Sequence, residues 1–284
     1  MNSKRLLLCT DMDRTVIPNG SQPEHPAARE LFRRFCEQSG IRLAYVTGRH
    51  LQLVKEAIAD FGLPEPDFAI TDVGSKIYRI SGGDWHEMSL WEEQIAADWR
   101  GQTHAQLRQA LLPIRELILQ EAEKQNRFKL SYYLALDADK ERVMERMREL
   151  LAELDVDASL IWSIDDVKLI GLLDVLPQNA TKLHGLLFLQ QQLGYTQAET
   201  LFAGDSGNDL PVLGSFVRSV LVANASGEVR ALACQLVRSS GHPDTLYLAQ
   251  QDGFDLGGNY AAGVLQGICH FYPEFRRQFE GGNP

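Results

Sequence analysis

Residues 6–15 read Leu-Leu-Leu-Cys-Thr-Asp-Met-Asp-Arg-Thr, an apolar run that ends in two aspartates one residue apart. The apolar run predicts a buried β-strand. Because strand side chains alternate, we expect Asp11 and Asp13 to share a face just past the strand's carboxyl end, where open α/β sheets bind ligands. Two carboxylates this close repel each other unless a proton or a divalent cation such as Mg²⁺ lies between them. A polar turn after an edge strand would have the same sequence.

A second acidic cluster follows another apolar run. Residues 201–209 read Leu-Phe-Ala-Gly-Asp-Ser-Gly-Asn-Asp. If a helix starts here, Asp205, Asn208 and Asp209 lie at i, i+3 and i+4 and share one face. Alone, this pattern would most often be a helix N-cap with an acidic first turn. Together with Asp11 and Asp13, it predicts an oxygen-rich cation site.

Two further segments suit a phosphate group. Thr47-Gly48-Arg49 follows the strand-like run 41–46, and a threonine hydroxyl beside helical N–H groups binds anionic oxygens well. Lys182 opens a helical pattern 23 residues before Asp205, and lysine is a compact cation that binds phosphate. The alternatives are a plain helix cap for Thr47 and a solvated surface position for Lys182.

In this order the segments 11–15, 46–49, Lys182 and 204–209 resemble the four motifs of the haloacid dehalogenase-like (HAD) phosphatases. A closer resemblance is to their sucrose-phosphate phosphatase branch, although related glycosyl-phosphate phosphatases share much of the pattern. Three stretches carry this closer resemblance, namely residues 70–78, 173–182 and 260–268.

The resemblance implies a role for each motif residue. Asp11 would attack phosphorus to form an aspartyl-phosphate, and Asp13 would protonate the departing sugar oxygen and then activate water. Thr47 and Lys182 would hold the phosphoryl group and offset its charge. Asn208 would orient Asp209 or the phosphate. Mg²⁺ would be the cofactor, and its ligands would be Asp11, the backbone carbonyl of Asp13, Asp205 and Asp209.

The chain reads as an α/β protein with an insertion. Strand–helix alternation predicts a Rossmann-like HAD core, a parallel sheet with helices on both faces, from residues 1–80 and 174–284. Residues 81–173 are expected to form an α+β cap of the HAD type IIB, entered through a loop at 81–84. Expected core strands are 5–11, 41–46, 67–71, 199–203 and 218–222, and expected core helices are about 26–39, 49–61, 180–193 and 207–213. Expected cap elements are a long helical region 89–126, a helix 138–153, and strands 127–136, 159–164 and 167–174.

Substrate contacts are expected from both parts. The core candidates are Thr47, Gly48, Arg49, Ser75 and Asn208. The cap candidates are Lys129, Tyr132, Tyr133, Asp166 and Lys168. Tyrosine rings and hydroxyl-binding polar groups suit sugars, although aromatic residues in a strand more often only pack.

Composition narrows the classes of function. The net charge of −10 gives no electrostatic footprint for nucleic acid and disfavours an anionic membrane surface. The four cysteines have no metal-ligand spacing and three fall in apolar runs, as is usual in a reducing compartment. No run is long enough to span a bilayer, and we expect a cytoplasmic protein.

The sequence therefore predicts a Mg²⁺-dependent phosphatase of a sugar phosphate, with sucrose 6-phosphate as the first candidate substrate. Another glycosyl-phosphate phosphatase, acting on mannosyl- or glucosyl-phosphoglycerate, is the alternative within that class. A phosphomutase would share the covalent intermediate. A non-catalytic sugar-phosphate binding module, partner to an upstream glycosyltransferase, is the alternative from another class, but it would not need the complete set of catalytic residues.

Overall fold

The computed structural model describes residues 5–165, 168–251 and 256–279. The chain folds into two compact units. The core unit comprises Met1–Glu87 and Gly185–Pro284, and the inserted unit comprises Met88–His184. The expected boundaries, at 80/81 and 173/174, fall inside two strands, whereas these divisions fall after a strand and within the first turn of a helix.

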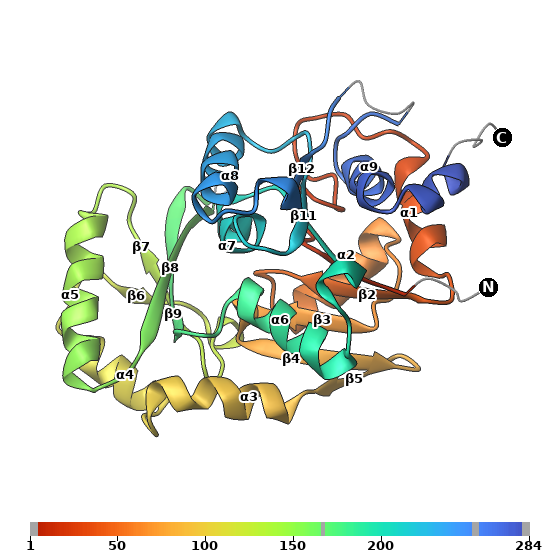
Figure 1. Ribbon diagram of the computed structural model, residues 1–284. Helices are drawn as coiled ribbons and strands as arrows, with labels where there is room; N and C mark the ends of the chain where they lie inside the picture. The colour runs from red at the N-terminus through yellow and green to blue at the C-terminus, as the bar shows by residue number, and fades with distance from the viewer. Residues whose placement is uncertain (1–4, 166–167, 252–255, 280–284) are drawn as a thin grey trace. The chain divides into compact units, whose positions relative to one another are not determined.

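The core unit is built on one eight-stranded sheet (Figure 1). Its strands run in the order β12-β11-β10-β1-β2-β3-β4-β5. Neighbours from β12 to β3 pair in parallel, and β4 and β5 are antiparallel additions. The strands are β1 (Leu6–Thr10), β2 (Ile41–Val46), β3 (Phe68–Thr71), β4 (Lys76–Ser81), β5 (Asp84–Glu87), β10 (Thr200–Gly204), β11 (Arg218–Leu221) and β12 (Leu246–Leu248).

β1 lies in the middle of this sheet and is buried over its whole length. A central parallel strand is covered on both faces, which is why its sequence is a continuous apolar run instead of an alternating one. The carboxyl ends of β10, β1, β2 and β3 are neighbours along one edge of the sheet. Residues that follow these four strands are therefore brought together from distant parts of the chain.

Helices cover both faces of the core sheet. Leu6 and Leu8 share one hydrophobic cluster with residues of α1, α2 and α9. α7 contacts β10 and β11, and its buried Val212 and Leu213 lie outside that cluster, on the opposite face. The helices are α1 (Ala28–Cys36), α2 (Leu51–Phe61), α6 (Lys182–Leu193), α7 (Leu210–Leu213), α8 (Gly227–Ser239) and α9 (Ala261–Phe271).

The segment 81–84 does not leave the core, contrary to the expectation of an exit loop. Gly82 and Gly83 have φ of 61° and 85° and form a two-residue hairpin turn between β4 and β5. Two successive positive φ angles match the right-handed twist of the flanking strands, and glycine adopts them without strain. The antiparallel edge of the otherwise parallel sheet follows from this turn.

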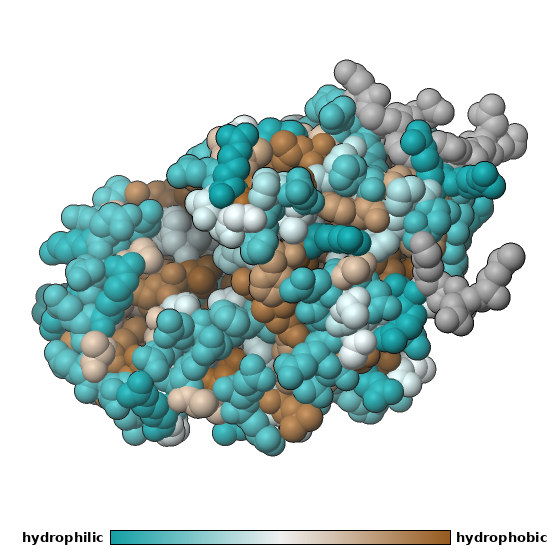
Figure 2. Space-filling model, in the orientation of Figure 1, coloured by the Kyte–Doolittle hydropathy of each residue, from teal (hydrophilic) through white to brown (hydrophobic). Residues whose placement is uncertain are grey.

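The inserted unit has its own four-stranded antiparallel sheet, in the order β6-β7-β9-β8. α5 is rich in charged side chains, and the surface over it, at the left of Figure 2, is largely hydrophilic. The expected α/β core with a separate α+β insertion is therefore confirmed. The elements of this unit are α3 (Ser89–Ala96), α4 (His104–Leu111), β6 (Ile118–Leu119), β7 (Leu130–Leu134), α5 (Lys140–Glu153), β8 (Ala158–Asp165) and β9 (Ile170–Pro177).

The expected long helical region 89–126 is broken into α3, α4 and the short strand β6. Arg100 and Gly101 have φ of 47° and 85°, which ends the first helical segment. Thr103 then starts α4 through a capping box with Gln106. The helical spacing of apolar residues predicted one long helical region, because it takes no account of residues that end or begin a helix locally.

The part of the chain after residue 222, in which the sequence patterns predicted no helix or strand, holds α8, β12 and α9. α9 is buried along nine of its residues, from Ala261 to Cys269, so it has no polar face to mark it as amphipathic. In the described parts of the chain, no helix combines the length and apolar character required to cross a membrane.

Candidate active site

Asp11 directly follows β1 and continues its pairing with β10. The N–H of Asp11 donates to the carbonyl of Ala203 at 2.8 Å, and the residue as a whole is 4% exposed. The chain then turns, because the N–H groups of Thr15, Val16 and Ile17 all donate to the carbonyl of Met12. This turn, and not continued strand alternation, positions the side chain of Asp13.

Asp205 and Asp209 come from the end of β10 and a short 3₁₀ helix, Gly207–Asp209. The Oδ2 atom of Asp209 accepts hydrogen bonds from the N–H groups of Asp205 and Ser206, both at 3.0 Å. Asp209 thus folds back over the strand end instead of projecting from a regular helix face. A Cβ on Gly204 would lie 2.6 Å from Cγ of Asp209, so only glycine leaves room for this arrangement.

Three of the four predicted metal ligands form a single group of carboxylates. One oxygen of each of Asp11, Asp205 and Asp209 lies within 4.8 Å of the others, and all three residues are buried. Buried like charges require nearby positive charge, and hard divalent cations such as Mg²⁺ prefer carboxylate oxygens. The donor set therefore fits Mg²⁺. The carboxylate of Asp13 is not a member of this group.

Asp13 is instead held by Arg49 and Asn19. Nε and Nη2 of Arg49 donate to the two carboxylate oxygens of Asp13 at 2.7 and 2.6 Å, and Nδ2 of Asn19 donates to Oδ1 at 2.7 Å. The hydrogen bonds to Asp13 raise the pKa of Arg49 above its usual value. Arg49 therefore stays charged, and the two-pronged contact orients the Asp13 carboxylate.

The Thr47-Gly48-Arg49 loop is braced by the loop that follows β3. The N–H groups of Asp72 and Val73 donate to the carbonyls of Arg49 and Thr47, at 2.9 and 3.3 Å. Asp72 and Val73 have φ of 52° and 63°, a conformation that is rare for non-glycine residues, above all for β-branched valine. Backbone strain of this kind persists where the surroundings impose it, and it clusters at functional sites.

The remaining candidates outside the inserted sheet differ in exposure. Thr47 is 1% exposed, and its hydroxyl oxygen accepts the N–H of Arg49 at 3.2 Å. Ser75 is fully buried and donates to the carbonyl of Asp72 at 3.0 Å. Asn208 is exposed, and its Oδ1 accepts from the hydroxyl of Ser206 at 2.8 Å. Lys182 begins α6 and is 2% exposed, which an ordinary surface lysine would not be.

In the inserted unit, Lys129 lies on one face of the sheet with Ser131 and Asp174. Ser131 pairs with Asp174 across β7 and β9, and its hydroxyl donates to the carboxylate. Nζ of Lys129 lies 4.0 Å from the Asp174 oxygen that accepts this bond. Tyr133 shares this polar face, and its hydroxyl donates to Glu121 at 2.8 Å.

Tyr132 points to the other face, because strand side chains alternate. It lies there with the apolar Leu130 and Leu173, close enough to Arg108 of α4 for the two to interact. Burial raises the pKa of Tyr132 to about 12. The structure thus separates the two tyrosines that the sequence grouped as candidates.

Lys168 is exposed, and its Nζ lies 5.9 Å from the ring centre of Tyr133. Asp166, the last cap candidate, lies outside the described residues.

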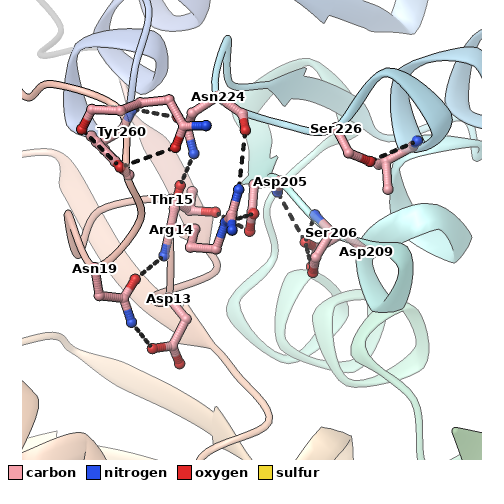
Figure 3. Close-up of polar contacts among 12 residues, drawn as sticks. Asp13, Arg14, Thr15, Asn19, Asp205, Ser206, Asp209, Asn224, Ser226 and Tyr260 are labelled. Carbon is pink, nitrogen blue, oxygen red and sulfur yellow. Dashed lines mark hydrogen bonds and ion pairs between the residues drawn. The ribbon is translucent and has the colours of Figure 1, made fainter. Parts of the chain in front are cut away.

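Sequence patterns missed Arg14, Asn19 and Asn224, which complete the polar network around the acidic group (Figure 3). Arg14 lies inside the first motif, but the sequence patterns assigned roles only to Asp11 and Asp13 there. Asn224 follows the end of β11, and a polar residue just past an expected strand of this sheet was the available signal.

Comparison with known proteins places this geometry in a family. A model of the sucrose-6F-phosphate phosphohydrolase family matches residues 4–272. The chain belongs to this family. It is therefore a phosphatase, a phosphoric monoester hydrolase of the HAD superfamily, and the expected resemblance to sucrose-phosphate phosphatases is confirmed.

Three members or relatives are similar over nearly the whole chain. A Nitrosococcus oceani protein described only as a HAD-like hydrolase is 46% identical over 279 residues, 98% of this chain and 75% of that protein. Mannosylfructose-phosphate phosphatase of Agrobacterium fabrum is 27% identical, covering 93% of this chain and 96% of the relative. The crystal structure of the Synechocystis sucrose-phosphatase with sucrose and phosphate has a TM-score of 0.74 at 28% identity, covering 95% and 98% of the two chains.

Proposed function

We propose that this phosphatase is Mg²⁺-dependent and hydrolyses a phosphorylated disaccharide or related glycosyl phosphate, with sucrose 6-phosphate as the first candidate. The buried carboxylate group of Asp11, Asp205 and Asp209 carries the proposal. The likeness to a sucrose-phosphatase over nearly the full length of both chains supports the choice of substrate.

In this proposal Asp11 is the nucleophile. One of its carboxylate oxygens attacks phosphorus, the bond between phosphorus and the sugar oxygen breaks, and an aspartyl-phosphate forms. Its backbone is paired to β10 through Ala203 at 2.8 Å, so the carboxylate is held on a rigid element. Water then attacks the phosphorus and releases phosphate from Asp11.

Asp13 is the proposed general acid and base. It gives a proton to the departing sugar oxygen and takes one from the attacking water in the second step. Arg49 and Asn19 aim its carboxylate through bonds of 2.6–2.7 Å and thereby act as positioning residues. The position of the carboxylate matters for proton transfer, because a misplacement of about 1 Å can lower the rate roughly a hundredfold.

The phosphoryl group is assigned to Thr47 and Lys182. The hydroxyl of Thr47 and the ammonium of Lys182 would bind its oxygens from buried positions, where charge-assisted hydrogen bonds are strong. When bound, Mg²⁺ supplies positive charge that offsets the carboxylates and the phosphate oxygens. Gly48, Asn208 and the buried Ser75 complete the proposed core contacts.

Sugar recognition is assigned to the polar face of the inserted sheet. Lys129, Ser131, Asp174 and Tyr133 offer donors and acceptors that match sugar hydroxyls, and Lys168 lies beside the Tyr133 ring. Tyr133 replaces Tyr132 in this proposal, because Tyr132 lies on the apolar face. The inserted unit, taken as the cap, would therefore set substrate specificity.

A second substrate is favoured by a specific observation. Mannosylfructose-phosphate phosphatase matches this chain at 27% identity, close to the 28% of the sucrose-phosphatase. Either sugar phosphate would be produced by a glycosyl-transfer reaction, so an upstream glycosyltransferase belongs to this proposal. Cys9, Cys36, Cys234 and Cys269, all within the described residues, form no disulfide bond, which supports a cytoplasmic setting.

The test is phosphate release from a panel of sugar phosphates, with Mg²⁺ and with EDTA. The panel holds sucrose 6-phosphate, mannosylfructose phosphate, mannosyl- and glucosyl-phosphoglycerate and simple hexose phosphates. Preference for sucrose 6-phosphate supports the whole proposal. Preference for another sugar phosphate of the panel changes only the substrate and leaves the mechanism as proposed. A hexose phosphate isomerised without phosphate release would indicate a phosphomutase, and sugar-phosphate binding without turnover would indicate a binding module.

Two variants separate chemistry from folding. Asp11→Asn is expected to lower turnover at least about a thousandfold by removing the nucleophile. The control Asp60→Asn changes an exposed aspartate of α2 in the same way and should retain full activity. Substantial turnover by Asp11→Asn would overturn the covalent mechanism.

A further inference from the structure

Arg14 stands in the middle of the first motif in a conformation that arginine rarely adopts. Its φ is 56°, in the left-handed region that non-glycine residues rarely adopt. Two asparagines hold this backbone. The Oδ1 atom of Asn19 accepts the N–H of Arg14 at 2.9 Å, and Nδ2 of Asn224 donates to its carbonyl at 2.6 Å.

The side chain of Arg14 lies against Asp205, one of the three grouped carboxylates (Figure 3). Nε of Arg14 is 3.3 Å from Oδ2 of Asp205, and this buried Nε makes no hydrogen bond. The contact is therefore an ion pair without hydrogen-bond geometry. Nη2 of Arg14 donates weakly to the carbonyl of Asn224 at 3.4 Å.

Asn224 joins three segments of the core unit around this arginine. Besides its bond to the carbonyl of Arg14, its Oδ1 accepts the N–H of Tyr260 at 2.8 Å. The hydroxyl of Tyr260 in turn donates to the carbonyl of Gln22 at 3.1 Å. Arg14 is thus held in place by the segments after β1 and β11 and by the start of α9.

Asp205 does not depend on Arg14 for its orientation. The hydroxyl of Thr15 donates to Oδ1 of Asp205 at 3.2 Å, and the backbone N–H of Asp205 is bonded to Asp209 at 3.0 Å. What Arg14 adds is charge, placed next to one of three buried carboxylates. A positive charge there stabilises the carboxylates without metal and repels a cation that binds them.

We propose that Arg14 is a built-in counter-cation of the acidic group, a positioning residue that weakens divalent-cation binding and stabilises the metal-free site. The inference deepens the proposed function and rests on its metal site. Arg14 and the bound ion would share Asp205, with the guanidinium near Oδ2. The site would then release Mg²⁺ readily and still remain folded when empty.

Two substitutions of Arg14 isolate its charge. Arg14→Gln keeps a long polar side chain and the same left-handed backbone but removes the charge, whereas Arg14→Lys keeps the charge. Arg34→Gln is the matched control, because it removes an exposed charge from α1 and changes net charge equally. Affinity for Mg²⁺ alone is measured by isothermal titration calorimetry, and thermal unfolding is followed in EDTA and in Mg²⁺.

Arg14→Gln is expected to bind Mg²⁺ roughly tenfold more tightly than the unaltered protein. It should also unfold at a lower temperature in EDTA, and added Mg²⁺ should raise its unfolding temperature by more than that of the unaltered protein. Arg14→Lys and Arg34→Gln should stay within about twofold of the unaltered affinity. Equal or weaker binding by Arg14→Gln overturns the inference, and so does an Arg14→Lys variant that behaves like Arg14→Gln.

The outcomes separate this inference from the proposed function. Tighter Mg²⁺ binding by Arg14→Gln, combined with no phosphate release from any sugar phosphate, supports the role of Arg14 and overturns the substrate. If the unaltered protein releases phosphate but Arg14→Gln has the same affinity for Mg²⁺, only the role of Arg14 is overturned. Mg²⁺ binding that is absent, or unaffected by Asp205→Asn, overturns both the metal site and the inference.

Discussion

Two hydrogen bonds, of 2.6 and 2.7 Å, join the guanidinium of Arg49 to both carboxylate oxygens of Asp13. The two residues are 36 positions apart in the sequence. They meet because β1 and β2 are parallel neighbours whose carboxyl ends lie side by side. Arg49 is 23% exposed and Asp13 40% exposed at the side chain, so the pair stands at the edge of the buried acidic group.

Arg49→Met should therefore impair the acid–base step more than metal binding. Loss of both bonds removes the two-pronged contact that orients the Asp13 carboxylate, and we expect turnover to fall about 10- to 100-fold. Mg²⁺ affinity should change by less than about threefold, because Asp13 is outside the group of three carboxylates. A loss of Mg²⁺ binding as large as the loss of turnover would contradict this division of roles.

Removal of the metal should destabilise the protein through the three grouped carboxylates. Their mutual repulsion is relieved when Mg²⁺ binds, so saturating Mg²⁺ should raise the unfolding temperature by several degrees relative to EDTA. In Asp205→Asn this rise should largely disappear, while unfolding in EDTA should occur at an equal or higher temperature. Differential scanning calorimetry of both proteins, with and without Mg²⁺, checks the prediction.

Gly204→Ala should disturb the acidic group without altering any of its carboxylates. The added Cβ would lie 2.6 Å from Cγ of Asp209, and we expect a loss of about 1–3 kcal/mol in unfolding free energy together with weaker Mg²⁺ binding. Gly207→Ala is the matched control, since no heavy atom lies within 4 Å of its added Cβ. Equal effects of the two substitutions in urea unfolding would show that crowding at Asp209 is not the cause.

Tyr132→Phe should change stability at high pH. The pKa of Tyr132 is raised by burial to about 12, above the usual 10, so its neutral form is favoured in the folded state. Its contribution is fully present below pH 10 and is lost as pH rises through about 12. We expect the unaltered protein to lose up to about 2 kcal/mol more than Tyr132→Phe across this window. Urea unfolding at pH 9 and pH 11 measures the difference.

The two tyrosines of the inserted sheet should differ in substrate binding. Tyr133→Phe removes the hydroxyl that bonds to Glu121 and accepts from Lys124 at 2.9 Å on the polar face. We expect KM for the sugar phosphate to rise about 3- to 10-fold, with kcat little changed. Tyr132→Phe should leave KM within about twofold. The reverse order of effects would show that the sugar is recognised on the other face.

The chemistry-bearing residues at the ends of β1, β2 and β10 could be recognised directly in the sequence. The runs before Asp11 and Asp205 are continuously apolar, and the run before Thr47 is interrupted only by Arg42. Such runs are typical of buried parallel strands, which place their last residues at one edge of the sheet. The acidic group of Asp11, Asp205 and Asp209 was predictable for this reason. The β4–β5 hairpin and the break of residues 89–126 into α3 and α4 were missed. A pair of glycines in the first case, and Gly101 with the Thr103 cap in the second, outweighed the hydrophobic pattern locally.

The sequence by itself determined the family, the α/β core and the identity of the residues that carry the chemistry. Only the tertiary structure decided how these side chains are paired: Arg49 with Asp13, Arg14 with Asp205, and Tyr132 with the apolar face. The motifs show which strand ends carry charged residues, but the long side chain of an arginine can reach more than one carboxylate. The turn after Met12 and the left-handed backbone of Arg14 settle that choice, because they aim each side chain after the strand has ended.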